Sequence, residues 1–277
     1  MNNWYDPLSI SNPDLVYLDT WVYRFLMDNT EYTSKLFNYL KTNILFPAVS
    51  DILLIEFSPK QQYIESINYL LCFLNSILLI NSDEILNKEV EKYPKEYTKT
   101  IIVPNGYLLA DLFNLNTKKK LSSSQVRIEW ENFRSDSRKM KSKLERVYNN
   151  YPVGNGGKYE KEQAEGFAKM ITIQWLCQAH PDFIKLNFDK FSISNMKVEL
   201  FKGLQTYAYY IFYKYYIGKR EPDKVSDFGD IFHLFYIPYC KLAVLERDQC
   251  SILRKIQKDN AILENVKIEN IDFIKTL

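Results

Sequence analysis

Short apolar runs alternate with amphipathic segments along the first hundred residues. The runs are rich in Leu, Ile and Val and have the length of buried strands, whereas the segments between them place apolar residues three or four apart, as a helix does. Strands are expected at residues 15–18, 44–49 and 77–80, and helices at residues 20–27, 31–41, 51–56, 61–75 and 83–92. This order predicts an α/β fold with a parallel sheet flanked by helices. Residues 100–103 fit either a fourth strand or a loop that leads into a helix.

Three polar residues interrupt the apolar segment that follows residue 223. Asp227, Asp230 and His233 recur at intervals of three, so on a helix the two aspartates share one side and the histidine lies about a turn further on. Pro238 ends this expected helix, because proline lacks the backbone donor that would continue it. Carboxylates in apolar surroundings are costly to bury alone, and a divalent metal ion is a common partner for them.

The other C-terminal elements continue the alternation. The pattern predicts a tyrosine-rich helix over residues 199–217, a strand over 242–245, a helix over 251–263 and an edge strand over 266–268. The tyrosines surround their helix, which favours core packing over a surface for stacking nucleobases. Glu246 and Asp248 come directly after the strand 242–245. Open α/β sheets bind ligands at the carboxyl ends of their strands, so these two acidic residues are candidates for a site.

The middle of the chain, residues 106–194, departs from this alternation and is predicted to be a largely helical insertion. Residues 125–147 read as one amphipathic helix, and ten Lys and Arg residues against four Asp and Glu residues lie within residues 117–146. The basic face suits contacts with nucleic-acid phosphates and equally suits a solvated helix surface. A glycine cluster within residues 149–158 marks a loop, and a helix is expected over residues 161–179.

Composition narrows the classes of protein. An aromatic content of 15% with 8 glycines favours helical packing over a sandwich with many tight turns. The four cysteines form no CxxC pair, which argues against a compact zinc motif and against a disulfide framework. The longest apolar stretch, near residues 67–80, is shorter than the about 20 residues that a membrane helix needs, and no signal-peptide pattern is present. A cytoplasmic protein without a membrane partner is expected.

The two ends of the chain together resemble a PIN-like nuclease domain. Near the N-terminus, the apolar residues 15–18 lead directly into Asp19 and then into a helix. Near the C-terminus, Asp230 opens the apolar part of a helix, and Asp248 follows a short strand 18 residues later. The resemblance depends on both halves in this order, since each short motif alone is common.

This resemblance implies a PIN-like core made from residues 1–105 and 195–277, with residues 106–194 inserted between the halves. It also implies an acidic site at the carboxyl ends of the strands. The residues expected to act there as catalytic groups or metal ligands are Asp19, Glu56, Asp230 and Asp248, with Asp227 as a further ligand and His233 as a group that orients a carboxylate or donates to phosphate. Glu89 competes with Glu56 for the second acidic position, and the more apolar surroundings of Glu56 favour it.

The implied activity is that of a Mg²⁺- or Mn²⁺-dependent endoribonuclease. Clustered carboxylates bind hard divalent cations, which orient water, aid its deprotonation and stabilise charge on a scissile phosphate. RNA is preferred to DNA on the resemblance alone, and the basic helix over residues 125–147 is the expected nucleic-acid contact. A protein that inhibits or regulates the nuclease is a further expected partner. The sequence leaves open a role in toxin activity, phage defence or RNA processing, and it leaves the oligomeric state open.

A second interpretation is a non-catalytic helical adaptor or nucleic-acid-binding protein without a metal ion. Asp19, Asp227 and Asp248 each stand near the start of an expected helix, where aspartate serves as an N-cap. Capping does not explain Asp230, which lies inside its expected helix. The chain also departs from the family pattern, because Arg247 stands where a Ser or Thr is expected before the last acid, and it would either bind phosphate or neutralise the site.

Overall fold

Five parallel strands form a single sheet in the order β3-β2-β1-β4-β5. The computed structural model describes residues 12–57, 61–97, 101–102, 151–152, 158–188, 192–218 and 231–277, with isolated residues between 131 and 142. The strands are β1 (Asp14–Leu18), β2 (Leu45–Val49), β3 (Ile77–Leu78), β4 (Leu242–Leu245) and β5 (Lys267–Asn270). The predicted α/β class, with a parallel sheet flanked by helices, is confirmed.

The order of the strands reverses direction at β1, the central strand. The chain runs outward from β1 through β2 to β3, and then returns to place β4 and β5 on the other side of β1. All residues of β2 and β4 are buried, as are residues 15–18 of β1. Helices therefore cover both faces of the sheet, which explains why these strands read as continuous apolar runs.

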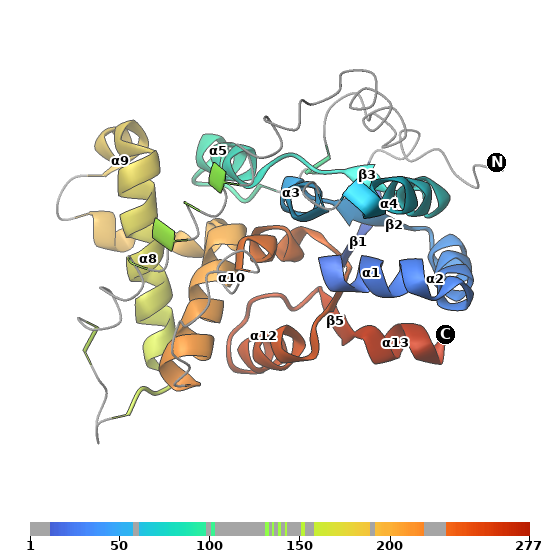
Figure 1. Cartoon of the computed structure of the whole chain (residues 1–277). Helices are drawn as coiled ribbons and strands as arrows, with labels where there is room; N and C mark the ends of the chain where they lie inside the picture. The colour runs from blue at the N-terminus through green and yellow to red at the C-terminus, as the bar shows by residue number, and fades with distance from the viewer. Residues whose placement is uncertain are drawn as a thin grey trace.

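One face of the sheet is covered by four helices. They are α1 (Thr20–Asp28), α2 (Thr30–Asn43), α4 (Gln61–Phe73) and α13 (Ile271–Thr276). Val16, Leu18 and Val244 point toward them from the two central strands and form one core. In Figure 1, α2 lies at the right of the molecule and α13 lies below it beside the C-terminus, while α1 and α4 lie next to the labelled strands.

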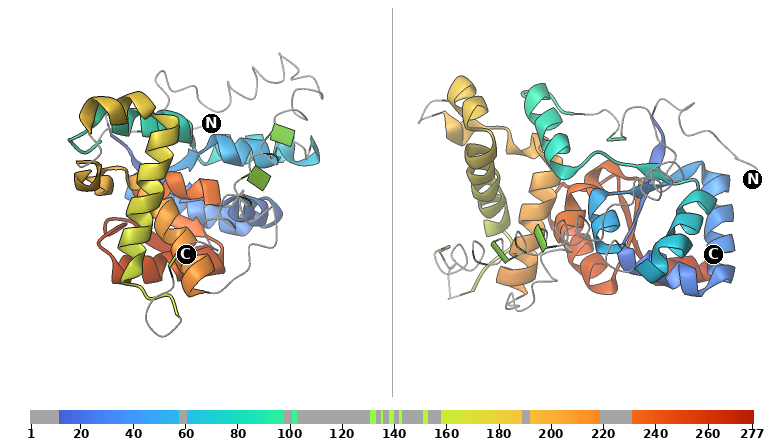
Figure 2. Two further views of the ribbon diagram at one scale, coloured as in Figure 1. Left: turned by 90° about the vertical axis from the view of Figure 1, so that its left-hand side faces the viewer. Right: turned by 45° about the horizontal axis from the view of Figure 1, so that its top comes forward.

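The opposite face of the sheet carries a larger core, and the remaining helices pack around this core. Leu15, Tyr17 and Ala243 point into this core. The helices around it are α5 (Ser82–Lys92), α8 (Gln163–Ala179), α9 (Pro181–Asn187), α10 (Lys202–Ile211) and α12 (Arg247–Asp259), while α3 (Asp51–Phe57) contributes to both cores. Helix α8 packs along α10, and with α9 these helices extend away from the strands (Figures 1 and 2).

The tyrosine-rich helix is confirmed as a core element. Residues 202–211 form α10, and the chain continues as a π-helical turn, η5 (Phe212–Ile217). The six tyrosines of this segment are all buried, at Tyr207, Tyr209, Tyr210, Tyr213, Tyr215 and Tyr216. They pack rather than form an exposed surface for stacking nucleobases.

The helix expected to end at Pro238 has a different form. The described part of this segment begins at residue 231, and its helical residues 231–232 lead into two 3₁₀ turns, η6 (His233–Phe235) and η7 (Ile237–Tyr239). Pro238 therefore lies within a turn instead of following a helix. Its missing donor is tolerated because it stands at the start of that turn, where backbone donors have no partner in the turn.

Several other expectations can be compared with the structure. Helix α5 begins after Asn81, whose side chain accepts from Glu84 N at 2.8 Å, so the cap predicted at Ser82 lies one residue earlier. Ile102 forms an isolated antiparallel bridge with Leu79, and within the described residues 101–102 no parallel strand is formed.

Most of the basic helix 125–147, and both Asp227 and Asp230, lie outside the described residues. No described helix is long and apolar enough to cross a membrane.

Candidate acidic site at the carboxyl ends of the strands

Asp19 lies at the point where the strand order reverses. It follows β1 directly, and its backbone N–H donates to Val244 O of the neighbouring strand at 3.0 Å. Its side chain caps α1, with Oδ1 accepting from Thr20 N at 2.7 Å, so the predicted capping role is confirmed. Asp19 is nevertheless only 7% exposed. A cap on a surface helix has no need of such burial, and ligands of open α/β sheets bind in the crevice at this position.

The electrostatics of Asp19 show that acidic groups gather around it. Burial raises the pKa of Asp19 to about 6, and the carboxylates of Glu56 and Glu246 act in the same direction. His233 and the N–H of Thr20 oppose this rise in the pKa. Like charges held together in a poorly solvated place destabilise one another, and a bound cation would relieve that repulsion.

Glu56, from the last turn of α3, is held beside Asp19 by two side chains. Its Oε2 accepts from the Thr20 hydroxyl, and its Oε1 lies 3.5 Å from Nε2 of His233. Burial alone would raise the pKa of Glu56, but His233, Thr20 and Arg24 outweigh it, and the pKa is lowered below its ordinary value. Glu56 therefore remains ionised at neutral pH.

Glu89, the competing candidate for the second acidic position, lies elsewhere. It is 3% exposed, accepts from the Tyr239 hydroxyl, and accepts from Gly203 N at 3.5 Å. Gly203 is in the first turn of α10, so Glu89 places a carboxyl group at the N-terminal end of that helix, where negative charge is favourable. The structure thus places Glu56 beside Asp19, and Glu89 within the packing of α5 against α10.

A buried polar network adjoins the acidic site, and sequence analysis did not find it. Nδ1 of His233 forms a hydrogen bond with the Tyr17 hydroxyl, which lies 3.0 Å from Oγ of Ser50. The Tyr236 ring stacks on Tyr17 with centroids 5.9 Å apart, and its hydroxyl donates to Asp51 Oδ1 at 2.5 Å. The available signal was the position of Tyr17, two residues before Asp19, because alternate residues of a strand share a face.

His233 is 1% exposed, and this burial separates its two expected roles. Its ring lies between the Tyr17 hydroxyl and the Glu56 carboxylate. Such a ring can orient a carboxylate, whereas contact with a phosphate would require access to solvent. The geometry supports the orienting role.

The end of β4 supplies Glu246 to the site more directly than Asp248. Glu246 stands at the N-cap position of α12 without a side-chain capping bond, and it is the residue from this strand that raises the pKa of Asp19. Asp248 is half-buried in the first turn of α12, so it does not cap the helix as predicted. Arg247 pairs with Asp272 of α13 at 2.8 Å, and thus its charge is directed toward α13.

The donor type fits a hard divalent cation, but the described donors do not make a complete ligand set. Asp19 and Glu56 offer carboxylate oxygens, which Mg²⁺ and Mn²⁺ prefer. Among the described residues, no group of three or more His, Cys, Asp and Glu side chains is arranged to hold a metal ion. Asp227 and Asp230, two of the expected ligands, are outside those residues.

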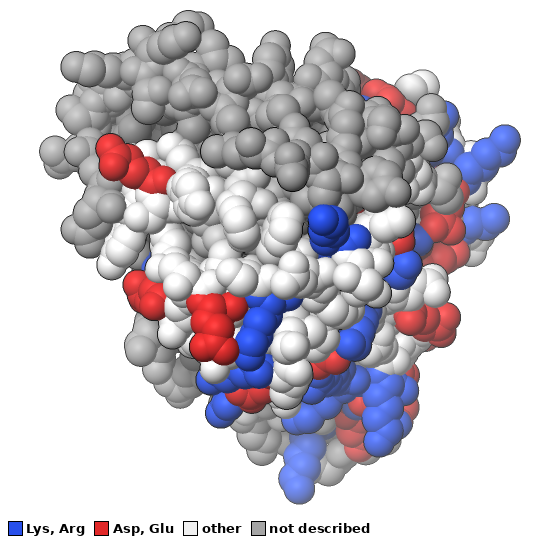
Figure 3. Space-filling model, turned by 90° about the vertical axis from the view of Figure 1, so that its right-hand side faces the viewer, with Lys and Arg blue, Asp and Glu red and all other residues white. Residues whose placement is uncertain are grey.

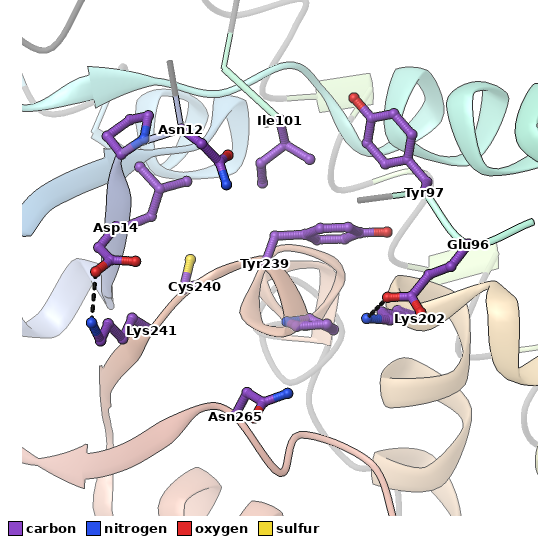
Figure 4. A pocket seen from close by; sticks show the side chains of 13 residues that line it. Asn12, Asp14, Glu96, Tyr97, Ile101, Lys202, Tyr239, Cys240, Lys241 and Asn265 are labelled. Atoms are coloured by element: carbon purple, nitrogen blue, oxygen red, sulfur yellow. Dashed lines mark hydrogen bonds and ion pairs between the residues drawn. The ribbon is translucent and has the colours of Figure 1, made fainter. Parts of the chain in front are cut away.

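A pocket of 490 Å³ lies at the other end of the sheet, where β1, β4 and β5 begin (Figure 4). Lys241 in this pocket pairs with Asp14 at 2.6 Å, and Lys202 pairs with Glu96. Each lysine is therefore compensated by a carboxylate of the same pocket. Its position and its balanced charges distinguish it from the acidic site.

Comparison of this chain with protein-family models, with curated proteins and with solved structures found no match.

Proposed function

We propose that this protein is a metal-dependent nuclease with a PIN-like core, and that RNA is its substrate. The proposal depends chiefly on one observation, the burial of Asp19 at the reversal of strand order with Glu56 and Glu246 acting on its charge. In an open parallel sheet this crevice is where ligands bind. The preference for RNA comes from the resemblance of the two chain ends to PIN-like nucleases.

The protein's own side chains would prepare the site for a cation. Glu56 is kept ionised and oriented by Thr20 and His233, and Asp19 is kept close to it by the N-cap of α1. A bound Mg²⁺ or Mn²⁺ ion would supply activation of water and stabilisation of charge on the phosphate. Because the pKa of Asp19 is raised without a cation, protons compete with the cation for this carboxylate, and cleavage should fall at acidic pH.

The buried network behind the site would keep these carboxylates in place. Tyr17 connects His233 to Ser50, so the orientation of the imidazole is set from the interior of the protein. Residues that hold a site by packing and hydrogen bonds on regular elements give it a defined geometry. His233 is thus proposed as a positioning residue for Glu56.

The test is cleavage of labelled single-stranded RNA and DNA by the purified protein, with Mn²⁺ and with EDTA. Asp19→Asn is expected to abolish cleavage, and so is Asp230→Asn. Asp182→Asn is a matched control, because the Asp182 side chain is 89% exposed on α9 and far along the chain from the site. Cleavage that requires the metal ion and Asp19, but not Asp182, is the expected result.

Two results would contradict the proposed function. Full cleavage by Asp19→Asn would refute the assignment of the site. A folded protein that cleaves neither substrate and whose melting temperature does not rise with Mn²⁺ would favour the non-catalytic adaptor, because a preformed acidic site is stabilised by the ion that it binds.

A further inference from the structure

A second pocket, of 350 Å³, follows helix α12 away from the acidic site. Four basic residues line it, Arg247, Arg254, Lys255 and Lys258, together with Ser251 and Asn270. None of the residues that line this pocket is acidic. The pocket begins at Arg247, one residue beyond Glu246, and Asn270 ends β5, so it starts at the same edge of the sheet as the acidic site.

The basic residues share one face of α12 because of their spacing. Positions 247, 251, 254, 255 and 258 recur at intervals of three and four, which places them along one side of a helix. The other side packs on the sheet through the buried Leu253 and Ile256. With a rise of about 1.5 Å per residue, the face extends about 16 Å from Arg247 to Lys258.

The charges on this face are available to an anion. Arg247 pairs with Asp272, and Arg254 pairs with Glu269 at 2.7 Å, but the two arginine side chains are 73% and 48% exposed. Exposed ion pairs of this kind contribute little, so a phosphate can compete for them. In the part of the chain that the structure describes, Lys255 and Lys258 have no carboxylate within ion-pair distance.

Arg254 is also held in a defined position. Its Nε donates to Ile268 O at 2.9 Å, and its Nη2 donates to the same oxygen at 2.6 Å. These bonds fix the guanidinium plane against β5 and reduce the side-chain freedom that binding an anion would otherwise remove. The pocket at the opposite end of the sheet differs, because each of its lysines is paired with an acid of that pocket.

We infer that this face of α12 binds the sugar–phosphate backbone of a nucleic-acid strand and leads it to Asp19. The identity of the ligand rests on the proposed function. A face of about 16 Å that carries four basic residues is long enough to contact more than one phosphate of a strand. Figure 3 shows Lys and Arg side chains gathered in the lower part of that view, the side on which α12 and α13 lie in Figure 1, with acidic side chains among them.

The experiment compares two double variants of the full-length protein in EDTA, so that binding is measured without cleavage. The first is Lys255→Gln with Lys258→Gln. The control is Lys92→Gln with Lys95→Gln, which removes two exposed lysines at the same spacing from another part of the surface. Binding of fluorescent single-stranded oligouridine is followed by anisotropy over a series of salt concentrations.

The α12 variant should bind the oligouridine more weakly, and the slope of log K against log salt should fall by about 1.4, since each contact with a single strand contributes about 0.7. The control should retain the affinity and the slope of the wild type. Glutamine keeps the helix propensity of lysine, so a change in fold is not expected, and circular dichroism verifies this.

Three results would overturn the inference. The α12 variant could bind as the wild type does, or both double variants could lose the same affinity. The third result comes from measuring the binding of the same variants to anionic phospholipid vesicles. If the α12 variant loses vesicle binding while its RNA binding is unchanged, the face is assigned to a membrane surface. The proposed nuclease activity is tested separately. RNA binding that depends on α12 in a protein that never cleaves would sustain this inference and refute the proposed function.

Discussion

Replacing Glu89 by Gln should make the protein more stable at alkaline pH while leaving the proposed activity intact. Burial raises the pKa of Glu89 to about 7 from its ordinary value of 4.5, although Tyr239, Gly203 and Lys202 act against this rise. A folded-state pKa above the unfolded one contributes stability that is fully present below pH 4.5 and is lost as the pH rises through 7. At about 1.4 kcal/mol per pKa unit, the loss amounts to about 3 kcal/mol.

Glutamine removes this titration while keeping a carbonyl oxygen for the Tyr239 hydroxyl and for Gly203 N. The variant and the wild type should therefore be close in stability at pH 5. Between pH 5 and pH 9 the free energy of unfolding of the variant should rise relative to the wild type by about 3 kcal/mol. Asp182→Asn, at an exposed position, serves as the control and should follow the wild type over this range.

The measurement is urea unfolding at several pH values in EDTA, read by tryptophan fluorescence and circular dichroism. A stability difference between Glu89→Gln and the wild type that stays constant from pH 5 to pH 9 would show that Glu89 titrates normally, and would refute the reasoning. Cleavage is measured in parallel with Glu56→Gln. Loss of cleavage in Glu89→Gln but not in Glu56→Gln would reverse the assignment of the second acidic residue.

Four further substitutions give separate tests. Asp19→Asn should abolish cleavage. In EDTA it should also raise the free energy of unfolding relative to the wild type by more at pH 8 than at pH 4, because burial and neighbouring acids raise the pKa of Asp19 to about 6 and the stabilising contribution of the wild-type side chain is lost above that pH; urea unfolding of both proteins at both pH values measures this. Tyr17→Phe should cost about 1–3 kcal/mol by removing a buried hydrogen bond to His233, and should lower kcat more than it changes KM, as steady-state kinetics with the RNA substrate would show. Gly203→Ala should destabilise by about 1–3 kcal/mol in thermal and urea unfolding, since its Cβ would lie 2.9 Å from a backbone oxygen. Gly166→Ala on α8, whose nearest atom would be 3.7 Å away, should stabilise by about 0.5–1 kcal/mol instead.

The elements themselves were readable from local patterns. Residues 15–18, 45–49 and 242–245 are apolar throughout or nearly so, and all are buried strands, because a parallel sheet covered on both faces needs no polar side. Asp19 could be recognised for the same reason, since a carboxylate directly after such a run stands at the end of a buried strand. The helices around these strands were found to within a few residues, with α12 starting four residues earlier than expected.

The form of the segment that contains His233 could not be read in this way. Spacing by three suits both an α-helix and a 3₁₀ turn, and the difference depends on how the residues before β4 pack against α10. The network from Ser50 through Tyr17 to His233 was equally hidden, because its members are far apart in the chain. Tyr17 is separated from Ser50 by 33 positions and from His233 by 216 positions.

The sequence by itself determined the class of the fold, the strand that ends directly before Asp19, and the competition between two glutamates for the second acidic position. Only the tertiary structure favours one of them, by placing Glu56 beside Asp19 and Glu89 at the start of α10. The tertiary structure also decided that the basic face of α12 begins beside the acidic site. Periodicity reports which side of an element is buried, but the neighbours of a polar group depend on strand order, and strand order is set by the packing of the whole chain.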